Sequence, residues 1–315
     1  MSKYSDDLPQ LSGRLFLTDG GIETYLIFHE RLDLPCFAAF HLLRDPIGRT
    51  VLTRYYERYI AIAKSSGAGF ILESPTWRAS TDWGDRLGYT HDEMSAVNRD
   101  AIRLMAELRA RHESKEMPIV ISGCVGPRGD GYDPGCTMSA AEAEAYHAHQ
   151  IAAFAEAGVD MVTAITMTNV DEATGIARAA QKHRVPVALA FTLETDGRLP
   201  TGQALGEAIA QLDGATEDAP VYYMISCAHP THFENTLAPS EPWTKRIRGI
   251  RANASKRSHR ELNDSPDLDD GDPIELGRQY NSLMRRHSQL TILGGCCGTD
   301  HRHVESISLA CRVVT

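Results

Sequence analysis

Short apolar segments alternate with longer amphipathic segments along the whole chain, and this alternation restricts the fold more than any other feature. Eight short segments predict strands, at residues 14–19, 70–74, 117–123, 160–166, 186–192, 220–226, 247–252 and 290–295. A stretch that can form a helix follows each of them. Strands alternating with helices are typical of βαβ units and a parallel sheet. Eight such units in 315 residues predict an α/β fold, a single closed (β/α)8 TIM barrel; a doubly wound open sheet is the alternative.

Helical periodicity is clearest in four of the intervening stretches. They predict helices at residues 49–67, 92–112, 139–158 and 169–183. Ser139 is the expected N-cap of the third, and Gly67 and Gly158 are expected to end the first and the third. The most polar segment, residues 253–273, is interpreted as an inserted loop, so we expect residues 1–315 to form one domain.

Composition and charge point to an enzyme that acts on small molecules. The net charge is −10, which argues against nucleic acid as the main partner. No apolar run approaches the roughly 18 residues of a membrane-spanning helix, so no membrane partner is expected. The polar N-terminus lacks the apolar core of a signal peptide, and we expect a cytoplasmic protein. A homo-oligomer is compatible with the sequence.

Three of the seven cysteines follow predicted strands directly. Cys227 comes after the sixth strand, and Cys296 and Cys297 come after the eighth. Active sites of such barrels lie at the carboxyl ends of the strands, so the three thiols are expected to meet at one mouth. Both neighbouring cysteines can reach one metal only if the chain bends, which Gly295 and Gly298 permit. Three thiolates with one open position predict a catalytic Zn2+ site.

Other interpretations of these cysteines remain open. A disulfide between Cys296 and Cys297 is disfavoured, because adjacent Cα atoms lie only about 3.8 Å apart. Inert buried thiols are a second alternative; we expect this ordinary role for the remaining cysteines, at 36, 124, 136 and 311. A histidine as fourth ligand would close the site, but the nearby histidines stand at helix starts, where we expect them to point to solvent: His229, His301 and His303.

Taken together, these segments resemble the homocysteine S-methyltransferase family, which includes betaine- and S-methylmethionine-dependent enzymes and the homocysteine module of methionine synthase. The resemblance rests on "TDGGIET" after the first strand, "GCVGPRGDGY" after the third, the lone cysteine after the sixth and "GGCCGT" after the eighth. It implies a zinc barrel of methionine biosynthesis. There the metal binds the acceptor thiol at its open position, and the thiolate attacks a methyl group of a sulfonium or quaternary ammonium donor. The implied partners are therefore a small-molecule thiol and a methyl donor.

The resemblance also implies roles for individual residues. Cys227, Cys296 and Cys297 match the metal ligands of the family. Asp19 matches the acid that holds the amino group of the acceptor. The backbone amides around Gly20 and Gly21 match the cradle for its carboxylate, where a missing Cβ allows close approach.

The chain departs from the family at the fourth strand. Ile165 stands where members usually carry a glutamate that holds the substrate ammonium, and Ser226 replaces the usual asparagine before Cys227. Two acids that follow strands are expected to compensate, Glu73 and Glu194. We therefore expect an acceptor thiol other than homocysteine, or homocysteine held in a different way.

The methyl donor leaves a weaker signal in the sequence. Aromatic faces attract sulfonium and quaternary ammonium groups, and three aromatic residues lie close together in sequence after the second strand: Trp77, Trp83 and Tyr89. Ordinary hydrophobic packing is the alternative. A carboxylate on donor or acceptor is expected to find an arginine, for which there are three candidates: Arg78, Arg128 and Arg198.

Two further classes of function remain open. In a zinc lyase or hydrolase on the same scaffold, water would be the fourth ligand and Glu73 or Glu194 the general base. In a non-enzymatic zinc reservoir or redox sensor, three thiolates would release zinc on oxidation. A reservoir needs no acids at strand ends, and a hydrolase more often uses histidine and carboxylate ligands.

Overall fold

Eight parallel strands close into a barrel in the computed structural model, which describes residues 2–237 and 241–312. Each strand pairs with the next, and the last pairs with the first, Phe16 lying opposite Ile292. The predicted (β/α)8 barrel is therefore confirmed, and the open sheet is wrong. The strands are β1 (Phe16–Leu17), β2 (Gly69–Glu73), β3 (Ile119–Val125), β4 (Met161–Met167), β5 (Val187–Thr192), β6 (Pro220–Ser226), β7 (Ile247–Ala252) and β8 (Ile292–Gly295).

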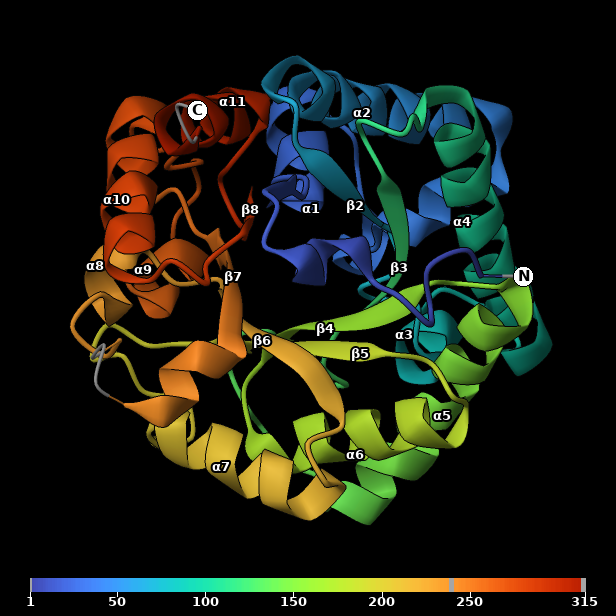
Figure 1. The fold of residues 1–315 in the computed structure, drawn as a ribbon. Helices are drawn as coiled ribbons and strands as arrows, with labels where there is room; N and C mark the ends of the chain where they lie inside the picture. Colours follow the sequence, from blue (N-terminus) through green and yellow to red (C-terminus); the bar gives the residue numbers. More distant parts are fainter. Residues whose placement is uncertain (1, 238–240, 313–315) are drawn as a thin grey trace.

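Helices surround the strands, as Figure 1 shows. The α-helices are α1 (Ile22–Thr24), α2 (Pro46–Ser66), α3 (Thr81–Arg86), α4 (His91–His112), α5 (Ala140–Ala157), α6 (Val170–Lys182), α7 (Leu205–Thr216), α8 (Pro230–Phe233), α9 (His259–Asn263), α10 (Pro273–Arg286) and α11 (His301–Cys311). Short 3-10 or π turns are η1 (Pro9–Ser12), η2 (Tyr25–His29), η3 (Pro35–Phe37), η4 (Ala39–Arg44) and η5 (Pro242–Arg246). No described helix is long and apolar enough to cross a membrane.

The ends of the predicted helices have clear local causes. The Ser139 side chain accepts from the Glu142 amide in a capping box, which starts α5 as predicted. Gly67 and Gly158 adopt left-handed conformations that end α2 and α5. Helix α2 begins three residues before the predicted position, because Asp45 caps the amides that follow it.

The N-terminal segment closes the lower end of the barrel, where the strands begin. Leu8 packs there with side chains from the first halves of the strands, among them Phe16, Ile71, Val120, Met161 and Ile292. The buried Asp160 carboxylate accepts from the backbone amides of Lys3 and Tyr4 and pairs with Arg109 at 2.5 Å. The opposite end, where the strands finish, is left for a pocket.

Candidate functional site

The three cysteines predicted to hold a metal lie together at the carboxyl ends of β6 and β8. The Sγ atoms of Cys227, Cys296 and Cys297 all lie within 4.8 Å of one another, and they form the one cluster of metal-ligand type among the described residues. Thiolates bound tetrahedrally to zinc at about 2.3 Å would lie roughly 3.8 Å apart. The three sulfurs therefore lie close to the spacing that one metal ion requires.

Cys227 owes its place to an unusual backbone turn. Its φ angle is 51°, in the left-handed region that non-glycine residues seldom adopt. The turn is held from both sides. The Cys227 amide donates to the Arg251 carbonyl at 3.0 Å, and its carbonyl accepts from His259 Nε2 at 2.7 Å and Asn253 Nδ2 at 3.1 Å. Strain of this kind persists where the surroundings over-determine the conformation, which is common at functional sites.

The loop after β8 bends as the glycine frame predicts, but the two glycines act differently. Gly298 adopts a φ of 76°, and its amide donates to Thr24 Oγ1 at 3.1 Å. Gly295 has no such conformation; a Cβ there would overlap the Thr299 side chain. One glycine therefore allows the turn, and the other allows the loop to fold back on itself.

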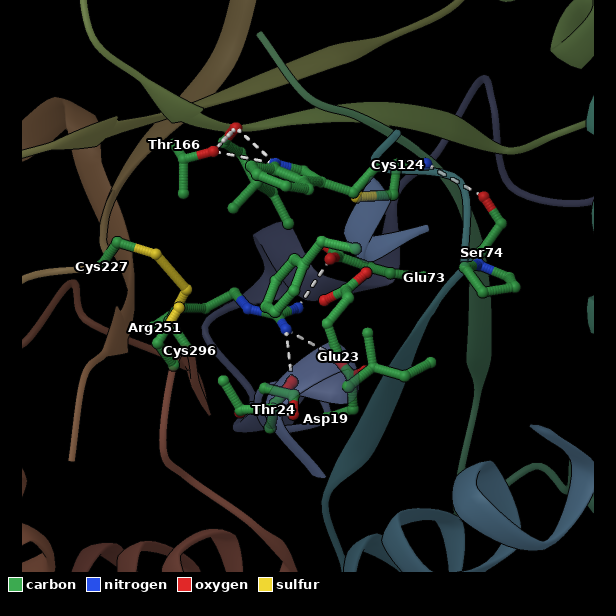
Figure 2. Close-up of a pocket in the computed structure, with 18 of the residues that line it drawn as sticks. Asp19, Glu23, Thr24, Glu73, Ser74, Cys124, Thr166, Cys227, Arg251 and Cys296 are labelled. Atoms are coloured by element: carbon green, nitrogen blue, oxygen red, sulfur yellow. Dashed lines mark hydrogen bonds and ion pairs between the residues drawn. A yellow bond between two sulfur atoms is a disulfide. The ribbon is translucent and has the colours of Figure 1, made fainter. Parts of the chain in front are cut away.

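Two of the three sulfurs are joined as a disulfide in this structure, between Cys227 and Cys296, whose Cα atoms lie 5.4 Å apart (Figure 2). The bond joins β6 to β8, not the two adjacent cysteines, so the vicinal pairing is wrong. We expected free thiols at all three positions, but in this structure only Cys297 of the three is a free thiol. A disulfide sulfur is not the thiolate that metals require. The disulfide and a metal site with three thiolates are thus alternative states of the same cluster.

A buried arginine crosses the floor of the pocket and pairs with two acids. Arg251 Nη2 lies 2.7 Å from Asp19 Oδ1, and its Nη1 lies 2.6 Å from Glu73 Oε2. All three side chains are at most 6% exposed. Tyr55 donates to the second oxygen of Asp19 at 3.0 Å. Asp19, expected to hold a substrate ammonium, therefore already has partners for both oxygens, as Figure 2 shows for Arg251.

Burial dominates the electrostatics of these acids. It raises the pKa of Glu73 to about 7, although the nearby Arg251 guanidinium opposes the shift. Burial also raises the pKa of Asp19, against the opposing effects of Arg251 and Tyr55. Glu73 Oε1 has no hydrogen-bond partner among the described residues. The pocket floor thus keeps a desolvated oxygen that can accept a hydrogen bond from a ligand.

The glycine pair after β1 brings two loops into contact. A Cβ on Gly21 would overlap the carbonyl of Cys296, and a Cβ on Gly20 would lie 2.8 Å from the carbonyl oxygen of Thr299. The Gly21 amide donates to that same carbonyl at 3.1 Å. These glycines therefore let the β1 loop pack against the cysteine loop; their part in binding a carboxylate stays a prediction.

An inner and an outer pocket adjoin at the cysteines. The inner one, of about 70 Å3, is lined by the three cysteines, Asp19, Glu73, Trp77, Ile165 and Arg251, among others. The outer one, of about 390 Å3, is lined by Cys227, Cys297, Trp77, Arg78, Tyr132 and residues of the polar segment 253–273. The inner pocket is a narrow space beside the sulfurs, and the outer pocket is wide enough for a second small molecule.

The three aromatic residues after β2 do not form an open cage. The Arg78 guanidinium lies 4.5 Å from the Trp77 ring centre and 3.7 Å from that of Trp83, so the chain's own cation covers both rings. Tyr89 packs elsewhere, 5.6 Å from Phe40. Trp77 lines both pockets and donates to Thr166 Oγ1 at 2.8 Å.

Of the three candidate arginines, Arg78 alone lines one of these two pockets, the outer one. Arg128 pairs with Asp82 at 2.7 Å, and Arg198 donates to the Gly202 carbonyl.

Other predicted residues lie outside the pockets. Glu194 does not line either pocket, and its Oε1 lies 3.1 Å from His259 Nδ1. His229 and His303 are buried in contacts of their own, so the expectation that they face solvent is wrong. His303 Nε2 contacts the Asp270 carbonyl at 2.7 Å. No histidine belongs to the sulfur cluster that the described residues form.

Two charged residues of the inner pocket were not predicted, Arg251 and Glu23. Arg251 is the next-to-last residue of β7, so the rule that strand ends face the mouth would have found it. Glu23 stands four residues after Asp19, within the quoted "TDGGIET" segment, and lines the inner pocket. Its side chain gave no signal of its own, because an acid in a loop is usually solvated.

Comparison with known proteins agrees with this geometry. The family model described as homocysteine S-methyltransferase matches residues 16–311. Homocysteine S-methyltransferase 1 of Arabidopsis thaliana is 21% identical over 330 residues, covering 98% of this chain and 96% of that protein. Selenocysteine Se-methyltransferase of Brassica oleracea var. italica is 21% identical, covering 96% of this chain and 90% of that protein.

The barrel itself resembles a solved structure. The homocysteine methyltransferase MmuM from Escherichia coli superposes with a TM-score of 0.75 in its oxidized form and 0.74 in its metallated form. Both forms are 19% identical and cover 96% of this chain, and the matches span 97% and 98% of those chains. At this identity the likeness establishes the fold. The family model matches nearly the whole barrel, and this match shows that the chain belongs to the homocysteine S-methyltransferase family.

Proposed function

We propose that this protein is a zinc-dependent S-methyltransferase, which moves a methyl group from a sulfonium or quaternary ammonium donor to a small thiol. The observation that carries the proposal is the convergence of Cys227, Cys296 and Cys297 beside a pocket at the carboxyl end of the barrel. Membership of the family supports methyl transfer to a thiol acceptor. The relatives named for homocysteine and selenocysteine support an amino-acid thiol or selenol as acceptor.

The donor set fits zinc. Three sulfur ligands leave one of four tetrahedral positions for a substrate. When bound, zinc supplies a positive charge that stabilises the acceptor sulfur as a thiolate, the nucleophilic form. Electron-rich sulfur ligands suit this task better than the activation of water, which metal sites with histidine and carboxylate ligands perform more often.

The chain's own residues shape the space around the reacting sulfur. Phe37, Pro75 and Ile165 give the inner pocket apolar walls. Arg251 fixes the carboxyl groups of Asp19 and Glu73 on the floor. The adjoining outer pocket offers the donor an approach to the cysteines.

The other classes of function find less support. Glu194 lies outside both pockets, so it is not placed to act as the general base of a hydrolase, and one oxygen of Glu73 is already held by Arg251. A zinc reservoir needs no pocket, whereas these thiols adjoin two.

Metal analysis of reduced protein tests the proposal. We expect about one zinc ion per chain, and we expect Cys227→Ser to lose it. Cys136→Ser, a change of the same type at an exposed cysteine, should keep it. X-ray absorption at the zinc edge should then show sulfur coordination rising from three to four when a thiol acceptor is added. Absence of zinc, or an unchanged spectrum with every thiol, would contradict the function.

A further inference from the structure

A buried imidazole contacts the strained turn at Cys227. His259 is the first residue of α9, within the polar segment 253–273, and it is 5% exposed. Its Nε2 lies 2.7 Å from the Cys227 carbonyl oxygen. A carbonyl oxygen only accepts, so Nε2 must carry the hydrogen and donate it. A side chain from the segment after β7 therefore holds the backbone of a cysteine that follows β6.

The same carbonyl oxygen has two further donors. Asn253 Nδ2 lies 3.1 Å from it and Thr192 Oγ1 lies 3.4 Å from it, so the His259 contact is the shortest of the three. A carbonyl oxygen has two lone pairs, and three donors exceed what its hydrogen-bonding capacity requires. These contacts therefore fix the direction of the peptide group in addition to satisfying a buried polar atom.

Two other loops hold the imidazole of His259 in place. Its Nδ1 lies 3.1 Å from Oε1 of Glu194, in the loop after β5. An ionised carboxylate only accepts, so this contact favours a hydrogen on Nδ1 as well. The Tyr132 ring, from the loop after β3, stacks on the imidazole with 4.0 Å between the ring centres and 9° between the planes. The carboxylate and the aromatic ring together orient Nε2 toward the Cys227 carbonyl.

We propose that His259, oriented by Glu194 and Tyr132, is a positioning residue that holds Cys227 in the conformation in which it binds the metal. This role rests on the proposed function, because it concerns one of the zinc ligands. A residue with a side chain at a φ of 51° is more stable in the right-handed or extended region. A return to those regions would turn the Cα–Cβ bond and move Sγ away from the other two sulfurs. The donor on the carbonyl oxygen opposes that rotation.

Zinc affinity of the folded, reduced protein, measured by competition with a chelator, tests the proposal. His259→Phe keeps a flat ring against Tyr132 and loses both hydrogen bonds. We expect it to weaken zinc binding about tenfold to a hundredfold, the usual effect of removing a group that orients a metal ligand. His259→Gln can still place an N–H donor near the Nε2 position, so it should recover most of the affinity. Glu194→Leu removes only the orienting carboxylate and should cause a smaller loss.

His232→Phe is the matched control for these variants. His232 Nε2 also lies close to a backbone carbonyl oxygen, that of Lys256 at 3.0 Å, but Lys256 is not among the predicted metal ligands. Zinc affinity should therefore stay unchanged in this variant. Denaturant unfolding of the metal-free, reduced variants is measured alongside. A merely structural role of His259 would lower the free energy of unfolding without changing the zinc affinity of the folded protein.

The possible results separate the positioning role from the proposed function. Unchanged zinc affinity in His259→Phe would overturn the role and leave the proposed function standing, as would an equal loss in His259→Phe and His259→Gln. The Glu194 side chain is 36% exposed, so Glu194→Leu should fold even if His259→Phe does not, and unchanged affinity in it would then overturn the role. Absence of zinc from the unmodified, reduced protein would instead refute the proposed function, and the positioning role with it.

Discussion

Arg251 is the residue that connects the loops at the mouth of the barrel. From β7 it reaches Asp19 after β1 and Glu73 at the end of β2, and its Nε donates to the Gly295 carbonyl of β8 at 3.0 Å. Three neighbouring strand ends are thus tied to one guanidinium group. A fork of fixed donors makes arginine better suited to this task than lysine.

Replacing Arg251 by methionine should therefore be strongly destabilising. The change leaves Asp19 and Glu73 buried without a counter-charge, and we expect a loss of about 3–5 kcal/mol in the free energy of unfolding. Denaturant unfolding of reduced, metal-free protein measures it. Arg248→Met on the same strand removes only a 3.3 Å hydrogen bond to the Leu11 carbonyl and should lower stability by less than about 1.5 kcal/mol. Equal losses would show that the ion pairs contribute nothing.

At the scale of elements, α11 determines where the cysteine loop ends. Asp300 caps the helix by accepting from the Arg302 amide at 2.9 Å, and it also contacts His303 Nδ1 at 3.1 Å. Burial alone would raise the pKa of Asp300, but hydrogen bonds with His303 and Arg302 hold it well below its usual range. A carboxyl group with a lowered pKa stabilises the fold while it is ionised.

This lowered pKa gives Asp300→Asn a pH-dependent effect. Asparagine can still cap the helix but carries no charge, so we expect a loss of about 1–3 kcal/mol in unfolding free energy at neutral pH. The difference from the unmodified protein should be full well above the ordinary aspartate pKa of about 3.9, and should shrink as the pH falls through that value. Unfolding curves at several pH values measure this. The exposed N-cap change Asp272→Asn should have a clearly smaller effect; a pH-independent loss at Asp300 would contradict this explanation.

At the scale of the whole molecule, the two ends of the barrel have different tasks. The cysteines and both pockets lie where the strands finish, and the N-terminal segment fills the end where they begin. In barrels of this class the catalytic residues lie at the end where the strands finish, and the residues at the end where the strands begin contribute to stability.

Leu8→Ala should separate these tasks. Leu8 is 5% exposed in the lower core, and its truncation should lower the unfolding free energy by about 2–5 kcal/mol. Zinc affinity, measured by competition with a chelator, should not change, because the cysteines lie at the opposite end. Leu309→Ala, at a side chain 57% exposed on α11, should alter stability by no more than about 0.5 kcal/mol. A parallel loss of zinc affinity in Leu8→Ala would show that the two ends are coupled.

The sequence by itself determined the barrel and the place of the three cysteines at its mouth. Strand positions follow from short apolar runs, and helix ends follow from caps such as Ser139 and Gly158. Both signals are local, so they can be read from neighbouring residues. The convergence of Cys227 with Cys296 could also be predicted, because closure of eight parallel strands brings the strand ends to one mouth.

Only the tertiary structure decided which charges in the pocket are paired. Arg251 contacts Glu73 at a sequence separation of 178 residues and Asp19 at a separation of 232. Sequence periodicity does not predict contacts between residues so far apart. The predicted acid Glu194 fell outside the pocket, and Glu23, which was not predicted, fell inside. Whether an acid is solvated, paired or left free depends on which side chains packing brings within a few ångströms, and that is a property of the folded molecule alone.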